Sequence, residues 1–308
     1  MAIFQLLCLT VITRLPGVYS NAYDLKCMTQ KVEMSIRRID RIKKTIYQTL
    51  RYPKGFQKCV MILGCQRSGT TLLSNVFSRI KFCKVYGEFS PISNQASDRI
   101  RLNPIDDVLG QFNRSHAPLI VCKPLVESQH ANQLLADIPH SSAIWFYRNY
   151  KDVGLSDIRK FKTNAGHGNI KAIVNDLPNN WRNEAVSAET RHLINEIYSP
   201  ELTPLDCACL FWYLRNSLFF EQQLQTLANV RLWRYEDFVE NPLAMVNELL
   251  TSNDLPVQQR DICAHVFGTS VSAAVDTELE PGIDHLCKEL FDKLMNHSNQ
   301  QMKNRLQQ

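Results

Sequence analysis

The stretch Cys59–Leu73 constrains the fold more strongly than any other part of the chain. It opens with an unbroken apolar run, which is typical of a buried strand in a parallel sheet. A loop bounded by Gly64 and Gly69 follows, and the apolar spacing from Leu72 to Ile80 then predicts a helix. In such a strand–loop–helix unit, successive backbone N–H groups and the helix amino end converge on an anion. The sequence therefore predicts a phosphate-binding loop.

The cation of this loop is displaced relative to that of an ATPase loop. An ATPase loop carries lysine directly after its second glycine, whereas this chain has Thr70 there and a cation earlier, at Arg67. The planar guanidinium of Arg67 suits phosphate oxygens, and Ser68, Thr70 and Thr71 add hydroxyl donors. A ligand-free glycine turn is the alternative, but such a turn would need neither an arginine nor three hydroxyls. We therefore expect an anion to bind without a metal ion.

Length and charge bound the class of protein. A chain of 308 residues is long enough to bury one α/β core. Its net charge of +5 suits an anionic ligand but falls short of what nucleic-acid-binding proteins carry, and no nucleic-acid-binding motif is present. We expect no nucleic-acid partner.

The ten cysteines lie mostly within apolar segments, without metal-ligand spacing or a compact disulfide framework. Buried free thiols favour a reducing compartment, so we expect a cytoplasmic protein without a metal site. A secretory-pathway or Golgi lumen is the alternative, because Val18–Ser20 resembles a signal-peptidase site and Asn113 and Asn296 begin glycosylation sequons. The apolar stretch Ala2–Ile12 is too short to span a bilayer.

Two parts of the chain are expected, an N-terminal segment of residues 1–55 and an α/β domain of residues 56–308. Within the first, apolar residues recur at helical spacing from about Lys31 to Arg51, and the opposite face is strongly basic. That face is either solvated on a packing helix or in contact with a membrane surface. Tyr52–Gly55 ends this helix.

Strands alternate with helices along the second part. Further strands are predicted at 84–88, 118–124, 142–148 and 230–236, and helices at 105–112, 129–138, 150–162, 205–227 and 241–250. This order implies a P-loop-like three-layer α/β fold, with a central parallel sheet flanked by helices. Ligands of such sheets bind outside the carboxyl ends of the strands. The glycine loop, Glu88, Lys123 and Arg148 all fall at such ends.

On these residues the chain resembles the sulfotransferase superfamily, closer to bacterial and Golgi-type members than to cytosolic small-molecule enzymes. The family moves a sulfuryl group from 3′-phosphoadenosine-5′-phosphosulfate (PAPS) to a hydroxyl or amine on a P-loop-like α/β fold. Gln66–Leu72 is similar to its 5′-phosphosulfate loop. The resemblance implies that PAPS is bound by this loop, whose residues are Gln66, Arg67, Ser68, Gly69, Thr70, Thr71 and Leu72.

A second segment, Trp145–Ser156, is similar to the family's 3′-phosphate segment, which implies that Arg148 and Ser156 hold the 3′-phosphate. Arg234–Pro242 is similar to a third signature that we interpret as structural. The family's Arg-Lys-Gly segment is not found in this chain. The residues that stack on adenine are therefore unassigned, although Trp181, Trp212 and Trp233 are available.

The resemblance also implies catalytic roles. Glu88 matches the position of a glutamate general base, with a structural salt bridge as the alternative role, and Glu127 and His130 are weaker candidates. Lys123 and Arg67 would stabilise charge on the bridging oxygen. The acceptor is expected to be a small-molecule or carbohydrate hydroxyl, contacted by residues 89–115 and 164–204.

Two other classes stay open at this point. A P-loop kinase or NTPase is disfavoured by Thr70 at the lysine position and by the lack of a clear Walker B aspartate. A non-catalytic PAP(S)-binding protein is disfavoured by the presence of both Glu88 and Lys123.

Overall fold

A computed structural model describes residues 39–97, 99–162, 165–259, 262–268 and 277–306. The chain divides into two compact units, Met1–Arg51 and Tyr52–Gln308. In the first unit, residues 39–51 are helical, as the apolar spacing predicts. The earlier part of that predicted helix and the apolar stretch Ala2–Ile12 lie outside the described residues.

The second unit is built on a five-stranded sheet in which every strand pairs in parallel, in the order β2-β3-β1-β4-β5. The strands are β1 (Lys58–Gly64), β2 (Cys83–Tyr86), β3 (Leu119–Cys122), β4 (Ser141–Tyr147) and β5 (Val230–Arg234). The predicted central parallel sheet is confirmed. β1 lies at the centre, and the chain crosses from one side of it to the other between β3 and β4, which places a ligand crevice beside the end of β1.

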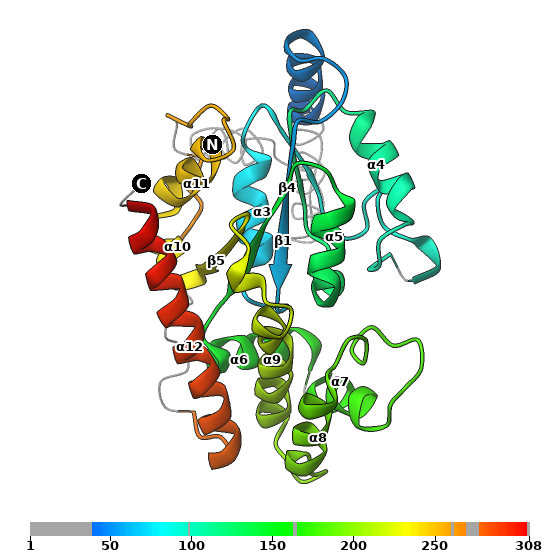
Figure 1. Ribbon diagram of the computed structural model, residues 1–308, viewed down its shortest axis with the longest axis vertical. Helices are drawn as coiled ribbons and strands as arrows, with labels where there is room; N and C mark the ends of the chain where they lie inside the picture. Colours follow the sequence, from blue (N-terminus) through cyan, green and yellow to red (C-terminus); the bar gives the residue numbers. More distant parts are fainter. Residues whose placement is uncertain (1–38, 98, 163–164, 260–261, 269–276, 307–308) are drawn as a thin grey trace, which may run out of the picture. The chain divides into compact units, whose positions relative to one another are not determined.

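Helices connect the strands and extend the domain at its C-terminal end. They are α3 (Thr70–Ser78), α4 (Ile105–Asn113), α5 (Ala131–Asp137), α6 (Tyr150–Phe161), α7 (Ala165–Val174), α8 (Ala188–Ile197), α9 (Pro204–Glu221), α10 (Tyr235–Glu240), α11 (Pro242–Thr251) and α12 (Pro281–Leu306). Three short 3₁₀ turns also occur, η1 (Gln95–Ser97), η2 (Leu125–His130) and η3 (Leu224–Thr226). Figure 1 shows α6, α7 and α9 beyond the carboxyl end of β1.

Strand β1 divides the core into two layers because its side chains alternate between the sheet faces. Met61 and Leu63 belong to the cluster that α9 and α12 cover, with Trp212 and Ile283 among its members. Val60 and Ile62 belong to the cluster that α3 and α11 cover. Helices on both faces of the sheet give the three-layer α/β architecture that the sequence predicts.

Element boundaries differ from prediction in places that matter for the site. β2 ends at Tyr86, so Glu88 follows the strand instead of ending it. α3 begins at Thr70, two residues before the predicted start, which places both loop threonines in the first turn. α9 ends at Glu221 instead of Leu227, because the chain turns through a left-handed residue, Gln223 (φ 54°).

The eight cysteines within the described ranges are free and buried, in agreement with the sequence-based expectation. Cys65 lies just past the end of β1, not on the strand. No helix in the described part of the chain combines the length and the apolar character needed to cross a membrane.

Candidate functional site

Two glycines fix the path of the loop between β1 and α3. Gly64 has a φ of 122°, and a Cβ placed there would lie 2.5 Å from the carbonyl oxygen of Phe146. Gly69 has a φ of 92°, and its Cβ would lie 2.5 Å from the ring of Tyr235. Any residue with a Cβ would clash at these two positions and would be strained at their positive φ angles, so both positions require glycine. The tight turn brings the loop under the amino end of α3.

The same loop leaves anion-binding groups unsatisfied. Gly69 is the N-cap of α3, and no side chain caps that helix end. The Ser68 side chain is fully buried, and its hydroxyl oxygen has no hydrogen-bond partner among the described residues. Buried polar groups are normally hydrogen-bonded. An anion bound at the uncapped start of α3 would supply a partner for the Ser68 hydroxyl and for the free backbone N–H groups of the helix.

Lys123 contacts both Glu88 and Thr71 beyond the carboxyl ends of the strands. The ammonium of Lys123 donates to Glu88 Oε2 at 3.1 Å and to Thr71 Oγ1 at 3.2 Å. Lys123 is 8% exposed, whereas the Glu88 side chain is 28% exposed. Lys123 directly follows β3, which lies between β2 and β1. The parallel sheet therefore brings together three residues that are separated by up to 52 positions in the sequence.

The loop also contacts α6 directly. The guanidinium of Arg67 donates to Ser156 Oγ from both Nε (3.2 Å) and Nη2 (3.0 Å). The preceding loop residue, Gln66, donates from Nε2 to Asp157 Oδ1 at 3.0 Å. Burial raises the pKa of the Asp157 carboxyl, while the amide of Gln66 and the charge of Arg67 oppose that rise. Two neighbouring loop residues are thus bonded to two neighbouring residues of α6.

Arg148 lies between β4 and α6, in a different environment from Ser156. Its Nη2 pairs with the buried Asp152 at 3.1 Å, and its guanidinium lies 4.4 Å from the ring centroid of Tyr235. The indole N–H of Trp212 donates to the Arg148 carbonyl at 3.0 Å and holds this end of β4 in place. A phosphate that binds Arg148 has to share the guanidinium with the Asp152 carboxylate.

Of the weaker base candidates, Glu127 is part of a partly buried ion-pair network that sequence reasoning missed. Arg101 donates to both carboxylate oxygens of Glu127, at 2.7 and 3.0 Å, and to Glu184 at 2.8 Å. Glu184 also lies 3.3 Å from His130 Nε2. These contacts tie the segment after β2 to η2 and to the segment before α8. No local pattern signals Arg101, because its partners lie 26 and 83 residues away.

Two of the three tryptophans considered for adenine are core residues. Trp212 is 0% exposed and Trp233 is 3% exposed. Trp181 is part-buried, and its ring centroid lies 4.5 Å from the guanidinium of Arg182 and 5.2 Å from that of the buried Arg215. Burial lowers the pKa of Arg215 to about 10.

Comparison with solved structures gives weak but uniform similarities. A sulfotransferase from Alicyclobacillus acidocaldarius is 13% identical (TM-score 0.46) and covers 79% of this chain and 95% of its own. The sulfotransferase domain of the Synechococcus PCC 7002 olefin synthase is 13% identical (TM-score 0.44), and the match covers 77% of this chain and 95% of that domain. Mouse sulfotransferase SULT7A1, solved in complex with PAP, is 13% identical (TM-score 0.39) and covers 80% and 87%.

Two further similar structures are also sulfotransferases or domains of them. No protein-family model and no curated protein sequence matches the chain.

Proposed function

We propose that this protein is a PAPS-dependent sulfotransferase that acts on a hydroxyl or amine acceptor. One observation carries the proposal. Beyond the carboxyl ends of the strands, Lys123 bonds both the loop residue Thr71 and the carboxylate of Glu88. Sulfuryl transfer to a hydroxyl requires an anion-binding loop, a cation and a carboxylate, and here the buried cation Lys123 is within hydrogen-bond distance of both the loop and the accessible carboxylate.

The residues present fit a donor with anions at both ends. Gln66–Leu72, with the uncapped start of α3 and the buried Ser68 hydroxyl, would hold the 5′-phosphosulfate. Arg148 and Ser156 would hold the 3′-phosphate. The hydrogen bonds from Arg67 to Ser156 join the loop to α6. They therefore support one ligand that contacts both the loop and the Arg148–Ser156 segment. PAPS supplies the sulfuryl group that is transferred.

Three side chains share two roles in this proposal. Glu88 accepts the proton of the attacking hydroxyl, through Oε1, which has no hydrogen-bond partner in the described part of the chain. Lys123 and Arg67 stabilise the charge that develops on the bridging oxygen. With a hydroxyl acceptor, a sulfur–oxygen bond to the acceptor would form as the sulfur–oxygen bond to the nucleotide breaks, and the acceptor proton would pass to Glu88.

A thermal-shift comparison of PAP, ATP and GTP, with and without magnesium, tests donor recognition. Selective binding to the folded state raises the melting temperature, so PAP without magnesium should stabilise the protein most. Greater, magnesium-dependent stabilisation by ATP or GTP would instead support a P-loop kinase or NTPase. Stabilisation by PAP without sulfuryl transfer to any hydroxyl in an acceptor panel would support a non-catalytic PAP(S)-binding protein.

A further inference from the structure

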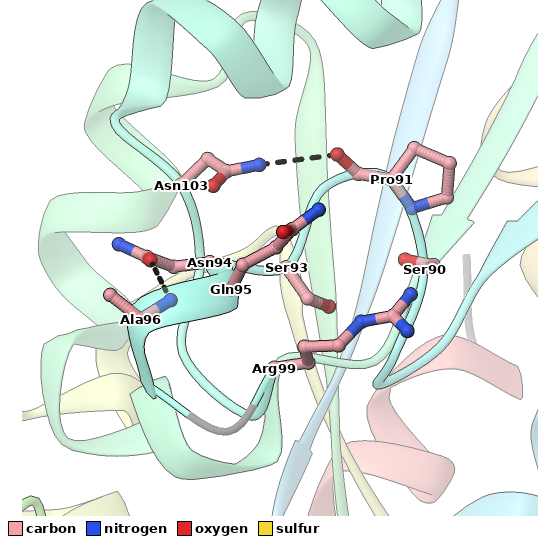
Figure 2. Close-up of a pocket in the computed structure, with 8 residues that line it drawn as sticks. All are labelled: Ser90, Pro91, Ser93, Asn94, Gln95, Ala96, Arg99 and Asn103. Carbon is pink, nitrogen blue, oxygen red and sulfur yellow. Dashed lines mark hydrogen bonds between the residues drawn. The ribbon is translucent and has the colours of Figure 1, made fainter.

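The turn that follows β3 determines where Lys123 lies. A pocket of about 750 Å³ between β2 and α4 is lined by neither Lys123 nor Glu88, so it does not bear on these two groups (Figure 2). Lys123 is followed by Pro124, which has no backbone N–H, and the chain there enters η2 instead of continuing β3. The position of the Lys123 ammonium therefore depends on what holds this turn.

The hydroxyl of Ser128 joins the turn to the first glycine of the loop. Pairing between β1 and β3 ends at Met61 and Cys122, whereas β1 continues to Gly64, so the β3 ladder does not reach the Gly64 N–H. Ser128 Oγ accepts from that N–H at 3.0 Å and donates to the Leu125 carbonyl at 2.8 Å. Because Ser128 is 0% exposed, solvent does not compete for either bond.

A buried arginine of α9 bonds the same carbonyl. Arg215 Nη2 donates to the Leu125 carbonyl at 2.9 Å, and its Nη1 donates to Gln129 Oε1 at 3.0 Å. Arg215 is 2% exposed, and burying a cation costs free energy unless its donors are paired. Here both donors bond η2. The turn after Lys123 is therefore held by the loop through Ser128 and by α9 through Arg215.

Two links consequently join the loop and the start of α3 to the chain that follows β3. The first is the hydrogen bond from Lys123 to Thr71, at 3.2 Å, which involves a reacting group. The second is the bond from Gly64 to Ser128, which involves none. Small displacements matter at such a place, because a misplacement of about 1 Å can lower a rate by about 10²-fold.

From this arrangement we infer that Ser128, supported by Arg215, is a positioning residue that fixes the loop relative to Lys123. The inference rests on the proposed function, because Lys123 acts on the donor only in that reaction. Ser128 and Arg215 are assigned no contact with PAPS, and both act through the placement of the Lys123 ammonium.

Ser128→Ala removes the hydroxyl with little change of shape. In the full-length protein it should lower the single-turnover rate of PAPS conversion to PAP by about tenfold and change PAP affinity by less than about twofold. The acceptor is the most reactive hydroxyl of the panel described above, or water. Ser298→Ala is the matched control, since Ser298 is also buried (4% exposed) and its hydroxyl donates to the Leu232 carbonyl at 3.0 Å, in α12 and away from the loop. It should keep the wild-type rate.

Coupling to Lys123 separates a positioning role from a structural one. In the Lys123→Met background, Ser128→Ala should change the rate by less than about twofold, because no ammonium is left to misplace. A purely structural role would lower the rate by the same factor in both backgrounds, and that result would overturn the inference. So would an unchanged rate in Ser128→Ala alone.

Arg215→Lys gives a second test that does not depend on the folding of Ser128→Ala. Lysine keeps the charge but cannot reproduce the fork that bonds Leu125 and Gln129, so the rate should fall by about threefold to tenfold. This loss should also disappear in the Lys123→Met background. Equal losses in the two backgrounds would count against the inference in the same way.

Two measurements distinguish failure of this inference from failure of the proposed function. If PAP does not stabilise the wild type and PAPS is not converted, the proposed function is wrong and the positioning role falls with it. If the wild type binds PAP and converts PAPS, but the losses from Ser128→Ala and Lys123→Met multiply, only the positioning role fails. Amide exchange at Gly64 should be about tenfold faster in Ser128→Ala than in Ser298→Ala, and equal rates would show that Ser128 does not hold the loop.

Discussion

The guanidinium of Arg67 donates two hydrogen bonds to the hydroxyl oxygen of Ser156, across 89 positions of sequence. Arg67 belongs to the loop that follows the central strand, and Ser156 to the helix that follows β4. This contact therefore joins the loop to α6 without a bound ligand. Substitution of either residue tests it.

Arg67→Lys should weaken PAP binding by about tenfold, because lysine cannot reproduce the two-pronged contact of a guanidinium. Ser156→Ala should weaken it less. If both side chains act on one ligand, the double variant should lose less than the sum of the two single free-energy changes. Calorimetric titration with PAP measures all three variants, and strict additivity would contradict a shared site.

Glu88→Gln should lower kcat by about 10²- to 10⁴-fold, because an amide cannot accept the acceptor's proton. PAP should stabilise this variant as it does the wild type, since the carboxylate is assigned no contact with the nucleotide. Glu189→Gln, an exposed residue in the first turn of α8, is the matched control and should keep its activity. Equal losses of PAP affinity and rate would show that Glu88 is not a base.

Lys123→Met should lower kcat by about 10²- to 10³-fold, comparable to the loss of one donor from an oxyanion site. Lys123→Arg keeps a cation and should retain more activity, provided the 8% exposed position accepts the larger group. Single-turnover kinetics with PAPS measure the chemical step in each variant. A kcat that is unaffected by Lys123→Met would rule out a role for this ammonium in the reaction.

Asp157→Asn should stabilise the protein at pH 7. Burial raises the pKa of Asp157 above its ordinary value, so the folded state binds the proton more tightly than the unfolded state. The Asp157 contribution to stability is therefore most favourable below the unfolded pKa of about 3.9, and it declines as pH rises through the folded pKa. Asparagine keeps an oxygen for Gln66 without the charge. Denaturation from pH 4 to 7 should show the gain from the substitution growing with pH.

Gly64→Ala should destabilise the protein by more than about 1 kcal/mol, because alanine is strained at a φ of 122° and its Cβ would meet the Phe146 carbonyl. Gly110→Ala is the matched control. Gly110 lies in α4, and a Cβ added there would have nothing within 4 Å, so alanine should stabilise by about 0.5–1 kcal/mol. Urea unfolding distinguishes the two, and equal effects would contradict the proposed tight turn.

The sheet could be predicted from the sequence because its strands are continuous apolar runs. β4 differs from prediction by one residue at each end, and β1 begins one residue before the apolar run that predicts it, which reflects burial on both sheet faces. The 26-residue helix α12 was not predicted, although its buried residues Ile283, Cys287, Leu290 and Leu294 recur at helical spacing. That signal was available in the sequence.

The contacts of the site were only partly predictable. The prediction that Glu88, Lys123 and the loop all lie at the carboxyl ends of parallel strands placed them on one side of the sheet, and the hydrogen bonds of Lys123 to Glu88 and Thr71 agree with that placement. The pairing of Arg148 with Asp152 was not predicted, although its i,i+4 spacing was visible in the sequence, whereas the Arg101 network could not be predicted. Long-range partners of arginines depend on how separate segments pack, and no periodicity in the sequence encodes that packing.

The side-by-side bonds from Gln66 to Asp157 and from Arg67 to Ser156 have a kinetic consequence. With two anchors, we expect the loop and the middle of α6 to move together, so that a nucleotide meets a surface that is already assembled. We expect association in a single concentration-dependent phase without a slow isomerisation, and little change in amide exchange of the loop upon saturation.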